Sequence, residues 1–148
     1  KDVHWLERAI QSKVERIVTI AYLSMVKIDR TLSRNLSDYQ ACWVALKDIK
    51  ALAFDHNLII KEAMIYIRQY IEINPSSLFN LLPRKFTASQ LRILYELIYG
   101  KQIDVRNFHK KIAMMEYVVP LDEKQQGVAH RAARYYHFDK KIYNKARR

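Results

Sequence analysis

Two apolar runs separated by a polar stretch make up the first third of the chain. Residues 17–26 are rich in β-branched and aromatic side chains and carry no charge, a composition that predicts a buried strand. Residues 27–40 are polar and predict a loop or a strand with a poor core face. Residues 41–46 predict a second, short strand, and residues 47–51 a turn of helix. We therefore expect two strands before residue 47.

A long helix is predicted over residues 56–73. Asp55 stands at its N-cap position, and Glu62 near its start and Arg68 near its end suit the helix dipole. Its apolar residues lie on more than one face of the helix: Ile59, Ile60, Ala63, Met64, Ile65, Ile67 and Ile71. A helix with this pattern is covered on two sides, and a partner subunit is one candidate for the second cover.

The clearest break in the chain is Asn-Pro-Ser-Ser at residues 74–77, four turn-forming residues. After it, Thr87 and Gln90 have the spacing of a capping box. They predict a helix over residues 88–99 that ends at Gly100, which suits the left-handed C′ position. The predicted inner face consists of Leu91, Leu94, Leu97 and Ile98.

A second helix is predicted from Asp104, its N-cap, after a short turn at residues 101–103. On a wheel of 100° per residue, its apolar residues fall within one arc of about 80°; they are Val105, Phe108, Ile112 and Met115. The polar side chains lie opposite or on the flanks: Arg106, Asn107, His109, Lys110 and Lys111. Any surface helix has a charged outer face, but the preceding helix and short turn favour a nucleic-acid-reading helix.

The segment that follows predicts a β-hairpin. Residues 118–121 and 132–138 form its strands and residues 122–127 its turn, with Gly127 free to take a positive φ. Long polar side chains gather at the tip: Lys124, Gln125, Gln126, His130 and Arg131. They can reach phosphates or a minor groove beside a docked helix, although a solvated loop would have the same composition. On the returning strand, Tyr136 and Phe138 are expected in the core and not as base-stacking platforms.

The charge distribution supports a polyanionic partner for the second half of the chain. Residues 1–74 contain 11 Lys/Arg and 9 Asp/Glu, a net charge of +2, and residues 75–148 contain 15 and 6, a net charge of +9. Such a field attracts polyanions but does not determine a fold. Nucleic acid is the first candidate and an anionic membrane surface the second.

Several classes of chemistry are not supported. The single cysteine, Cys42, excludes an internal disulfide, suits a reducing cytosol and is expected to be buried. The longest apolar run is about half of the ~20 residues that a membrane helix needs. Two glycines cannot form a phosphate-binding loop of the Walker or dinucleotide type, and the five histidines have no zinc-ligand spacing. We assign no catalytic and no metal-binding residue.

Four segments together resemble a known family. They are residues 52–60 (LAFDHNLII), 86–96 (FTASQLRILYE), 104–112 (DVRNFHKKI) and 129–138 (AHRAARYYHF). They resemble the NrtR-type regulators, bacterial transcription factors in which a Nudix domain is followed by a winged helix. The resemblance covers about residues 1–139. It implies an α+β chain, with an incomplete Nudix-like α/β sandwich over residues 1–74 and a winged helix-turn-helix domain over residues 75–148.

The resemblance also implies partners and site residues. A homodimer would read a palindromic double-stranded DNA operator, with Arg106, Asn107, His109, Lys110 and Lys111 in the major groove and Lys124, His130 and Arg131 of the wing on the backbone. The Nudix-like half would bind an effector such as ADP-ribose or a sugar near Phe54, Asp55 and His56.

One departure from the family pattern decides the activity we expect. The Nudix box, whose glutamates hold catalytic Mg²⁺, is absent from these 148 residues, so no cofactor is assigned; Mg²⁺ would be implied only by an intact box upstream. The N-terminus has neither Met nor a signal sequence, and we expect it to be the interior of a longer protein. The leading hypothesis is a cytoplasmic, effector-controlled regulator of NAD or sugar metabolism with a non-catalytic sensor. A Nudix hydrolase acting on ADP-ribose or a nucleotide sugar is the alternative, and an RNA-binding winged helix is a third candidate.

Overall fold

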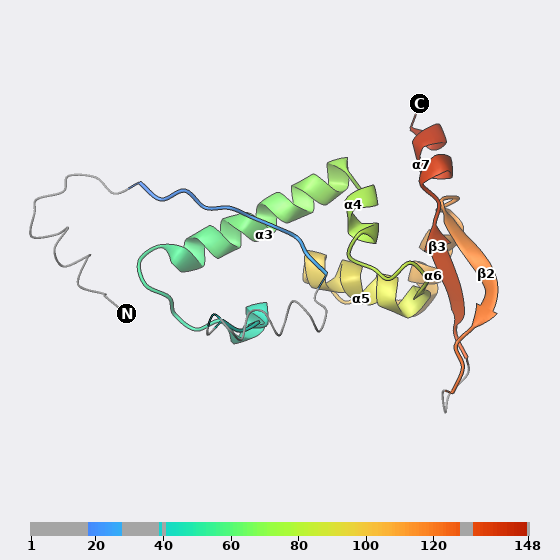
Figure 1. Ribbon diagram of the computed structural model, residues 1–148, viewed down its shortest axis with the longest axis horizontal. Coiled ribbons are helices and arrows are strands. Elements are labelled where there is room, and N and C mark those ends of the chain that lie inside the picture. The colour runs from blue at the N-terminus through green and yellow to red at the C-terminus, as the bar shows by residue number, and fades with distance from the viewer. Residues whose placement is uncertain (1–17, 28–38, 40, 128–131, 148) are drawn as a thin grey trace, which may run out of the picture.

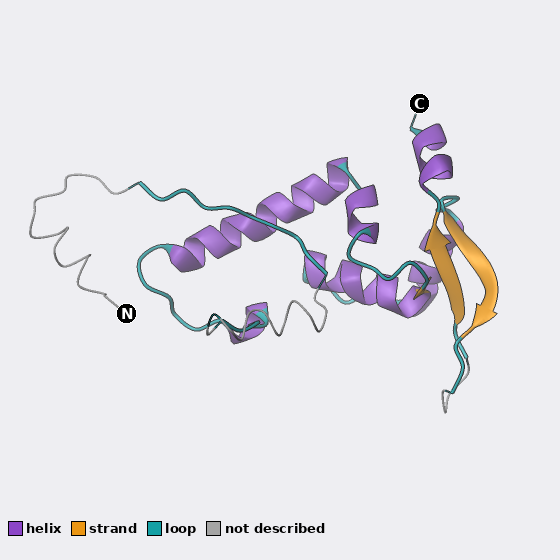
Figure 2. Cartoon of the chain, viewed as in Figure 1, coloured by secondary structure: helices purple, strands orange, loops and turns teal. Residues whose placement is uncertain are grey.

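The chain is elongated in the computed structural model, which describes residues 18–27, 39, 41–127 and 132–147 (Figure 1). The long helix α3 (His56–Ile73) runs along its middle, and an antiparallel sheet stands at one end. Among the described residues before α3, the only regular element is a short 3-10 helix, η1 (Leu46–Asp48). All described strands belong to the last part of the chain (Figure 2).

The second half forms a winged helix. Helix α4 (Ser76–Phe79) is followed by β1 (Phe86–Thr87), α5 (Ala88–Tyr99), α6 (Val105–Ala113), β2 (Val118–Lys124) and β3 (Arg134–Phe138). The strand order is β1-β3-β2, and both pairs are antiparallel. The α+β fold class and the winged helix-turn-helix are therefore confirmed.

The hydrophobic core lies between these helices and the sheet. Phe79 from α4 stacks on Phe138 from β3, with 4.4 Å between ring centroids, and Tyr136 and Phe138 both pack against the core. The expectation that these two aromatics are core residues is confirmed. The most deeply buried side chains are Phe86, Phe108, Ile71, Leu78 and Leu91. Ile71 belongs to α3, so the core of the winged helix extends across the predicted division at residue 74, which stays a prediction.

Helix α5 has the predicted bounds because its caps are local. The Thr87 side chain accepts a hydrogen bond from the Gln90 N–H (3.2 Å), and the Gln90 side chain accepts one from the Thr87 N–H (2.9 Å). Gly100 follows with a φ of +63° and donates its N–H to the Glu96 carbonyl (2.8 Å). The predicted inner face is wrong for Leu97, which is 67% exposed, and Tyr95 is buried in its place.

The β2–β3 hairpin is longer than predicted. Strand β2 continues through residues 122–124, where the turn was expected, because Lys124 pairs with Arg134 across a register irregularity. Gly127 has the expected positive φ, +69°. His130 and Arg131 lie outside the described residues.

The strands predicted before residue 47 are wrong for the described residues. Residues 18–27 and 41–45 form no strand, and most of their side chains are exposed, Tyr22 by 93%. Cys42 is also exposed, not buried. A strand needs a hydrogen-bonded neighbouring strand, and the described strands pair only with one another, in the sheet of β1, β3 and β2. The Nudix-like sandwich is therefore not confirmed, and the predicted helical turn at residues 47–51 corresponds to η1, one residue earlier.

Helix α3 has its predicted bounds, but its N-terminus is not capped as expected. Asp55 occupies the N-cap position, yet its side chain accepts no capping hydrogen bond. Asn57 instead holds the preceding loop: its Oδ1 accepts from the Leu52 N–H (2.7 Å), and its Nδ2 donates to the Lys50 carbonyl (3.2 Å). Neither the first nor the last turn carries the charges that the helix dipole would favour.

A C-terminal helix, α7 (Lys140–Ala146), was not predicted. The Asp139 carboxylate accepts from the N–H groups of Lys141 (2.8 Å) and Ile142 (3.0 Å) and so caps its N-terminus. These bonds lower the pKa of Asp139. Tyr143 is buried against Tyr117 and Phe138. The Arg147 guanidinium donates to the Ile73 carbonyl (3.1 Å), which joins α7 to the C-terminus of α3.

Candidate nucleic-acid interface

The two faces of α6 differ in burial as its sequence predicts. Phe108 and Ile112 are 1% and 4% exposed, and Met115, just after the helix, is 8% exposed. The five polar residues of the predicted reading face are all exposed: Arg106, Asn107, His109, Lys110 and Lys111. Val105 was predicted on the buried face, but it is 52% exposed. It is the first residue of the helix, before the helix reaches the core.

Local contacts fix where α6 begins and which way it faces. The Asp104 carboxylate accepts from the Asn107 N–H (2.9 Å), as expected of an N-cap. The Phe108 ring meets Tyr95 of α5 edge to face, with centroids 5.7 Å apart. The Lys111 Nζ lies 4.3 Å from the centroid of the same Tyr95 ring, a cation–π contact. Lys111 therefore stands over α5, while Arg106 and Lys110 lie on the outer face.

The turn between α5 and α6 is held by one carboxylate. Glu96 Oε1 accepts from the Arg92 guanidinium (2.6 Å) and from the Ile103 N–H (2.8 Å). The side chains of Arg92 and Glu96 are 23% and 21% exposed. Sequence patterns did not identify this contact, because it depends on the conformation of the turn.

The hairpin places further cations close to one another. Lys124 on β2 and Arg134 on β3 are directly paired across the strands, and both are exposed. Like charges in such a pair are destabilising by themselves. Glu123 on β2 forms an ion pair with Lys85, the residue before β1 (2.7 Å). Arg134 was not among the predicted site residues, because its position opposite Lys124 depends on the strand register.

A hollow of about 330 Å³ connects α6 with the hairpin. His109 from α6 and Arg134 from β3 both line it, together with Met115, Pro120 and Tyr136. A smaller hollow of about 200 Å³ lies between α5 and α6 and is lined by Arg92, Ser89 and His109, among others. The structure thus brings the predicted helix face and the base of the wing to one surface.

The predicted effector residues lie at the start of α3. Phe54 has a φ of +55°, unusual for a residue with a side chain, and is 68% exposed. Its ring lies edge to face with His56, at 6.1 Å. Phe54, Asp55 and His56 do not line the hollow that residues 23–25 form with α3 and α4, so their effector role stays a prediction.

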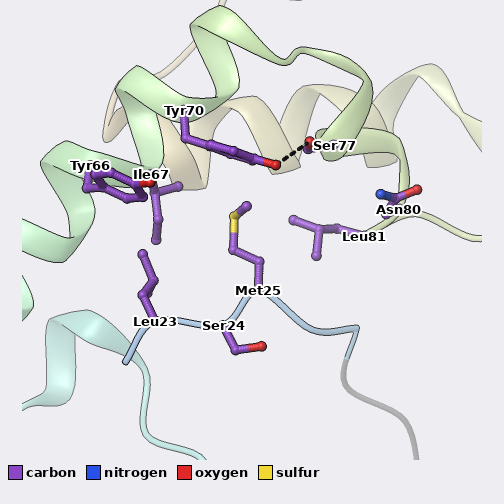
Figure 3. A pocket seen from close by; sticks show the side chains of 9 residues that line it. All are labelled: Leu23, Ser24, Met25, Tyr66, Ile67, Tyr70, Ser77, Asn80 and Leu81. Atoms are coloured by element: carbon purple, nitrogen blue, oxygen red, sulfur yellow. Dashed lines mark hydrogen bonds between the residues drawn. The ribbon is translucent and has the colours of Figure 1, made fainter. Parts of the chain in front are cut away.

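That hollow, of about 390 Å³, lies where α3 meets α4 (Figure 3). Leu23 and Met25 of the extended segment point toward α3, and Ser24 between them points away (Figure 3). Across from them stand Tyr66 and Tyr70, stacked at 6.3 Å, and the Tyr70 hydroxyl lies 3.5 Å from the Ser77 Oγ. The described residues that line it are apolar or uncharged polar residues.

The described residues provide neither a metal site nor a membrane-spanning helix. No group of three or more His, Cys, Asp or Glu side chains among them could hold a metal ion. Within the same residues, every helix is too short or too polar to cross a membrane.

Comparisons with known proteins bear on the second half of the chain. Residues 78–138 match the family model described as the NrtR DNA-binding winged helix domain. No curated protein matches the chain. Among solved structures, it is similar to Shewanella oneidensis NrtR complexed with a 27mer DNA, with 22% identity and a TM-score of 0.45 over 68% of this chain and 51% of that one. A second structure of Shewanella oneidensis NrtR has 23% identity to this chain and a TM-score of 0.44, with the same coverage of both chains. The chain thus spans about half the length of these proteins.

Proposed function

We propose that this protein is a DNA-binding transcriptional regulator, because residues 78–138 match the family model described as the NrtR DNA-binding winged helix domain. Helix α6 enters the major groove, and the β2–β3 hairpin lies along the adjacent backbone, as in other winged helix-turn-helix proteins.

The observation that carries this proposal is the division of α6 into two faces. One face is fixed in the core by Phe108 and Ile112. The other presents Arg106, Asn107 and Lys110 to solvent on a rigid support. Arginine reads guanine and asparagine reads adenine by paired hydrogen bonds in the major groove, so we assign base contacts to Arg106 and Asn107.

Phosphate contacts are assigned to the cations around that face. Lys124 and Arg134 face each other across the hairpin, and a DNA phosphate between them would offset their mutual repulsion. Lys110 and Lys111 extend the same positive surface, and the His109 ring can add a hydrogen bond beside them. His130 and Arg131, which follow Gly127 in sequence, complete the proposed wing contacts.

The proposal also covers how an effector controls DNA binding. We propose a cytoplasmic homodimer whose first half is a non-catalytic, Nudix-like sensor for ADP-ribose or a sugar, and which regulates NAD or sugar metabolism. An effector can change DNA affinity only if it binds one arrangement of the dimer more tightly than another. The proximity of residues 23–25 to the α3–α4 corner, next to the winged-helix core, supports a connection between the two halves.

Substitution of Arg106 by alanine tests the groove assignment. We expect a loss of about 1–3 kcal/mol in binding to the preferred duplex, with relaxed preference at one base pair, because a base-reading pair is lost. Affinities would be measured by fluorescence anisotropy on duplexes obtained by selection from random DNA. Unchanged affinity and preference would contradict the assignment, and tighter binding of structured RNA than of duplex DNA would contradict the proposed function.

Substitution of Lys124 by alanine tests the phosphate assignment. Binding should weaken alike for all duplex sequences, and the slope of log K against log salt should fall by about one unit, because one phosphate contact is lost. Lys145→Ala is the matched control. It removes the same charge from α7, at the opposite end of the hairpin from its tip (Figure 1), and should leave the slope almost unchanged.

A further inference from the structure

Glu96 occupies a position that is unfavourable for helix α5 by itself. It lies in the last turn of the helix, at the negative end of the helix dipole, where a carboxylate is destabilising. The ion pair with Arg92 has the cation on the N-terminal side, the weaker order for an i, i+4 pair. A residue that departs from local preference in this way is expected to have a role elsewhere in the fold.

The contacts of Glu96 show where that role lies. Its carbonyl accepts from the Gly100 N–H (2.8 Å) and its Oε1 from the Ile103 N–H (2.8 Å), so one residue holds both ends of the turn. Ile103 packs against the core, and the next residue, Asp104, caps α6. The Ile103 N–H is part-buried, and removing its acceptor would leave a donor unsatisfied.

We propose that Glu96 is a positioning residue that sets how α6 is presented to DNA. The proposal rests on the proposed function. By fixing the Ile103 N–H, the carboxylate fixes the start of α6 and therefore the direction in which Arg106 and Asn107 point. Arg92 acts as a brace, because its guanidinium holds the same oxygen from the other side. Glu96 itself contributes nothing attractive to DNA, being an anion beside a polyanion.

Because Glu96 acts on the orientation of α6, its loss should affect sequence-specific DNA binding and non-specific DNA binding differently. Base contacts depend on a fixed helix orientation, whereas attraction between cations and phosphates tolerates small changes of orientation. Loss of Glu96 should therefore lower the affinity for the preferred duplex and leave that for random duplex nearly unchanged. A defect that only reduced the folded fraction would lower both affinities by the same factor.

The test compares three variants of the full chain on the preferred duplex and on random duplex. Glu96→Ala should lower the ratio of specific to random affinity by about tenfold, the order of discrimination that one misplaced base contact provides. Glu96→Gln keeps an oxygen at the same reach and should preserve the ratio within about threefold. Glu96→Asp keeps the charge but is one methylene shorter, and should behave like the alanine variant.

The ratio should therefore follow the reach of the side chain and not its charge. Glu62→Ala, which removes an exposed carboxylate from α3, is the control and should leave the ratio unchanged. An unchanged ratio in both Glu96→Ala and Glu96→Asp would overturn the inference, as would equal loss on both duplexes. If the wild-type chain bound no duplex at all, the proposed function itself would be wrong. If Glu96→Ala did not fold, the comparison of the Gln and Asp variants would still decide.

Discussion

Tyr95 of α5 contacts both the buried face and the exposed face of α6. Its ring stacks on Tyr99 at 6.0 Å and meets Phe108 edge to face, and the Lys111 ammonium lies above it. Only 7% of the residue is exposed. The pKa of its phenol is raised to about 12, chiefly by burial and also by the nearby Tyr117 and Tyr99. The phenolate is therefore disfavoured in the folded chain.

The raised pKa of Tyr95 predicts a loss of stability in alkali. Between pH 10 and about 12 the unfolded chain releases a proton from Tyr95 that the folded chain keeps. The stabilisation is complete below pH 10 and is lost as the pH rises through 12, at up to about 1.4 kcal/mol per pH unit. Urea denaturation at several pH values would measure the free energy of unfolding.

Tyr95→Phe should remove this part of the pH dependence, so that the difference in unfolding free energy from the wild type changes steadily above pH 10. Tyr22→Phe is the control, because Tyr22 is 93% exposed, and its pH profile should match the wild type. Parallel profiles for Tyr95→Phe and wild type would show that Tyr95 ionises equally readily in both states.

At the scale of elements, α7 joins the wing sheet to α3. Arg147 donates to the Ile73 carbonyl and to the Tyr143 hydroxyl (3.0 Å). Arg147→Met should lower the free energy of unfolding by roughly 0.5–1 kcal/mol, because an exposed cation at a helix C-terminus has an effect of this size. Chemical denaturation measures the change. Lys145→Met, which removes a charge from the same helix, should have a smaller effect, and equal effects would argue against a specific contact with α3.

The elements that sequence predicted well are those whose signals are local. Thr87, Gln90 and Gly100 fix both ends of α5 within a few residues, and Asp104 does the same for the start of α6. Helix α7 is also locally capped, by Asp139, but it is only seven residues long. Its stability comes from Tyr143 against Phe138 and Tyr117, contacts that periodicity does not show.

Strand pairing and side-chain burial depend on residues far away in sequence, and the sequence predicted these two features less well. Residues 18–26 have strand composition, yet no described segment pairs with them. Leu97 has the spacing of an inner-face residue, but α5 turns Tyr95 inward in its place. The polar face of α6 was predicted correctly, because the helix period alone separates it from Phe108 and Ile112. Arg134 and Glu96 depend on strand register and on turn conformation, which sequence alone does not provide.

For the whole molecule, we propose that a second copy of the chain covers part of the exposed apolar surface of the described residues. Tyr22, Leu58 and Tyr66 are each more than half exposed, on the extended segment and on α3. Exposed apolar groups of this extent mark interaction surfaces. None of them belongs to α6 or to the β2–β3 hairpin, so a second copy could cover them without covering those elements.

A homodimer formed through this surface predicts a symmetric binding site. Two winged helices related by a twofold axis contact half-sites about one helical turn apart, roughly 34–36 Å. Selection from random duplex DNA should therefore enrich inverted repeats with one fixed spacing. Tyr66→Glu, which places a charge in the apolar surface, should reduce the chain to a monomer in analytical ultracentrifugation and weaken binding to the repeat much more than to a single half-site, because the two halves then bind independently. Enrichment of single, unpaired half-sites by the wild-type chain would contradict the dimer, while the contacts of α6 with each half-site would remain.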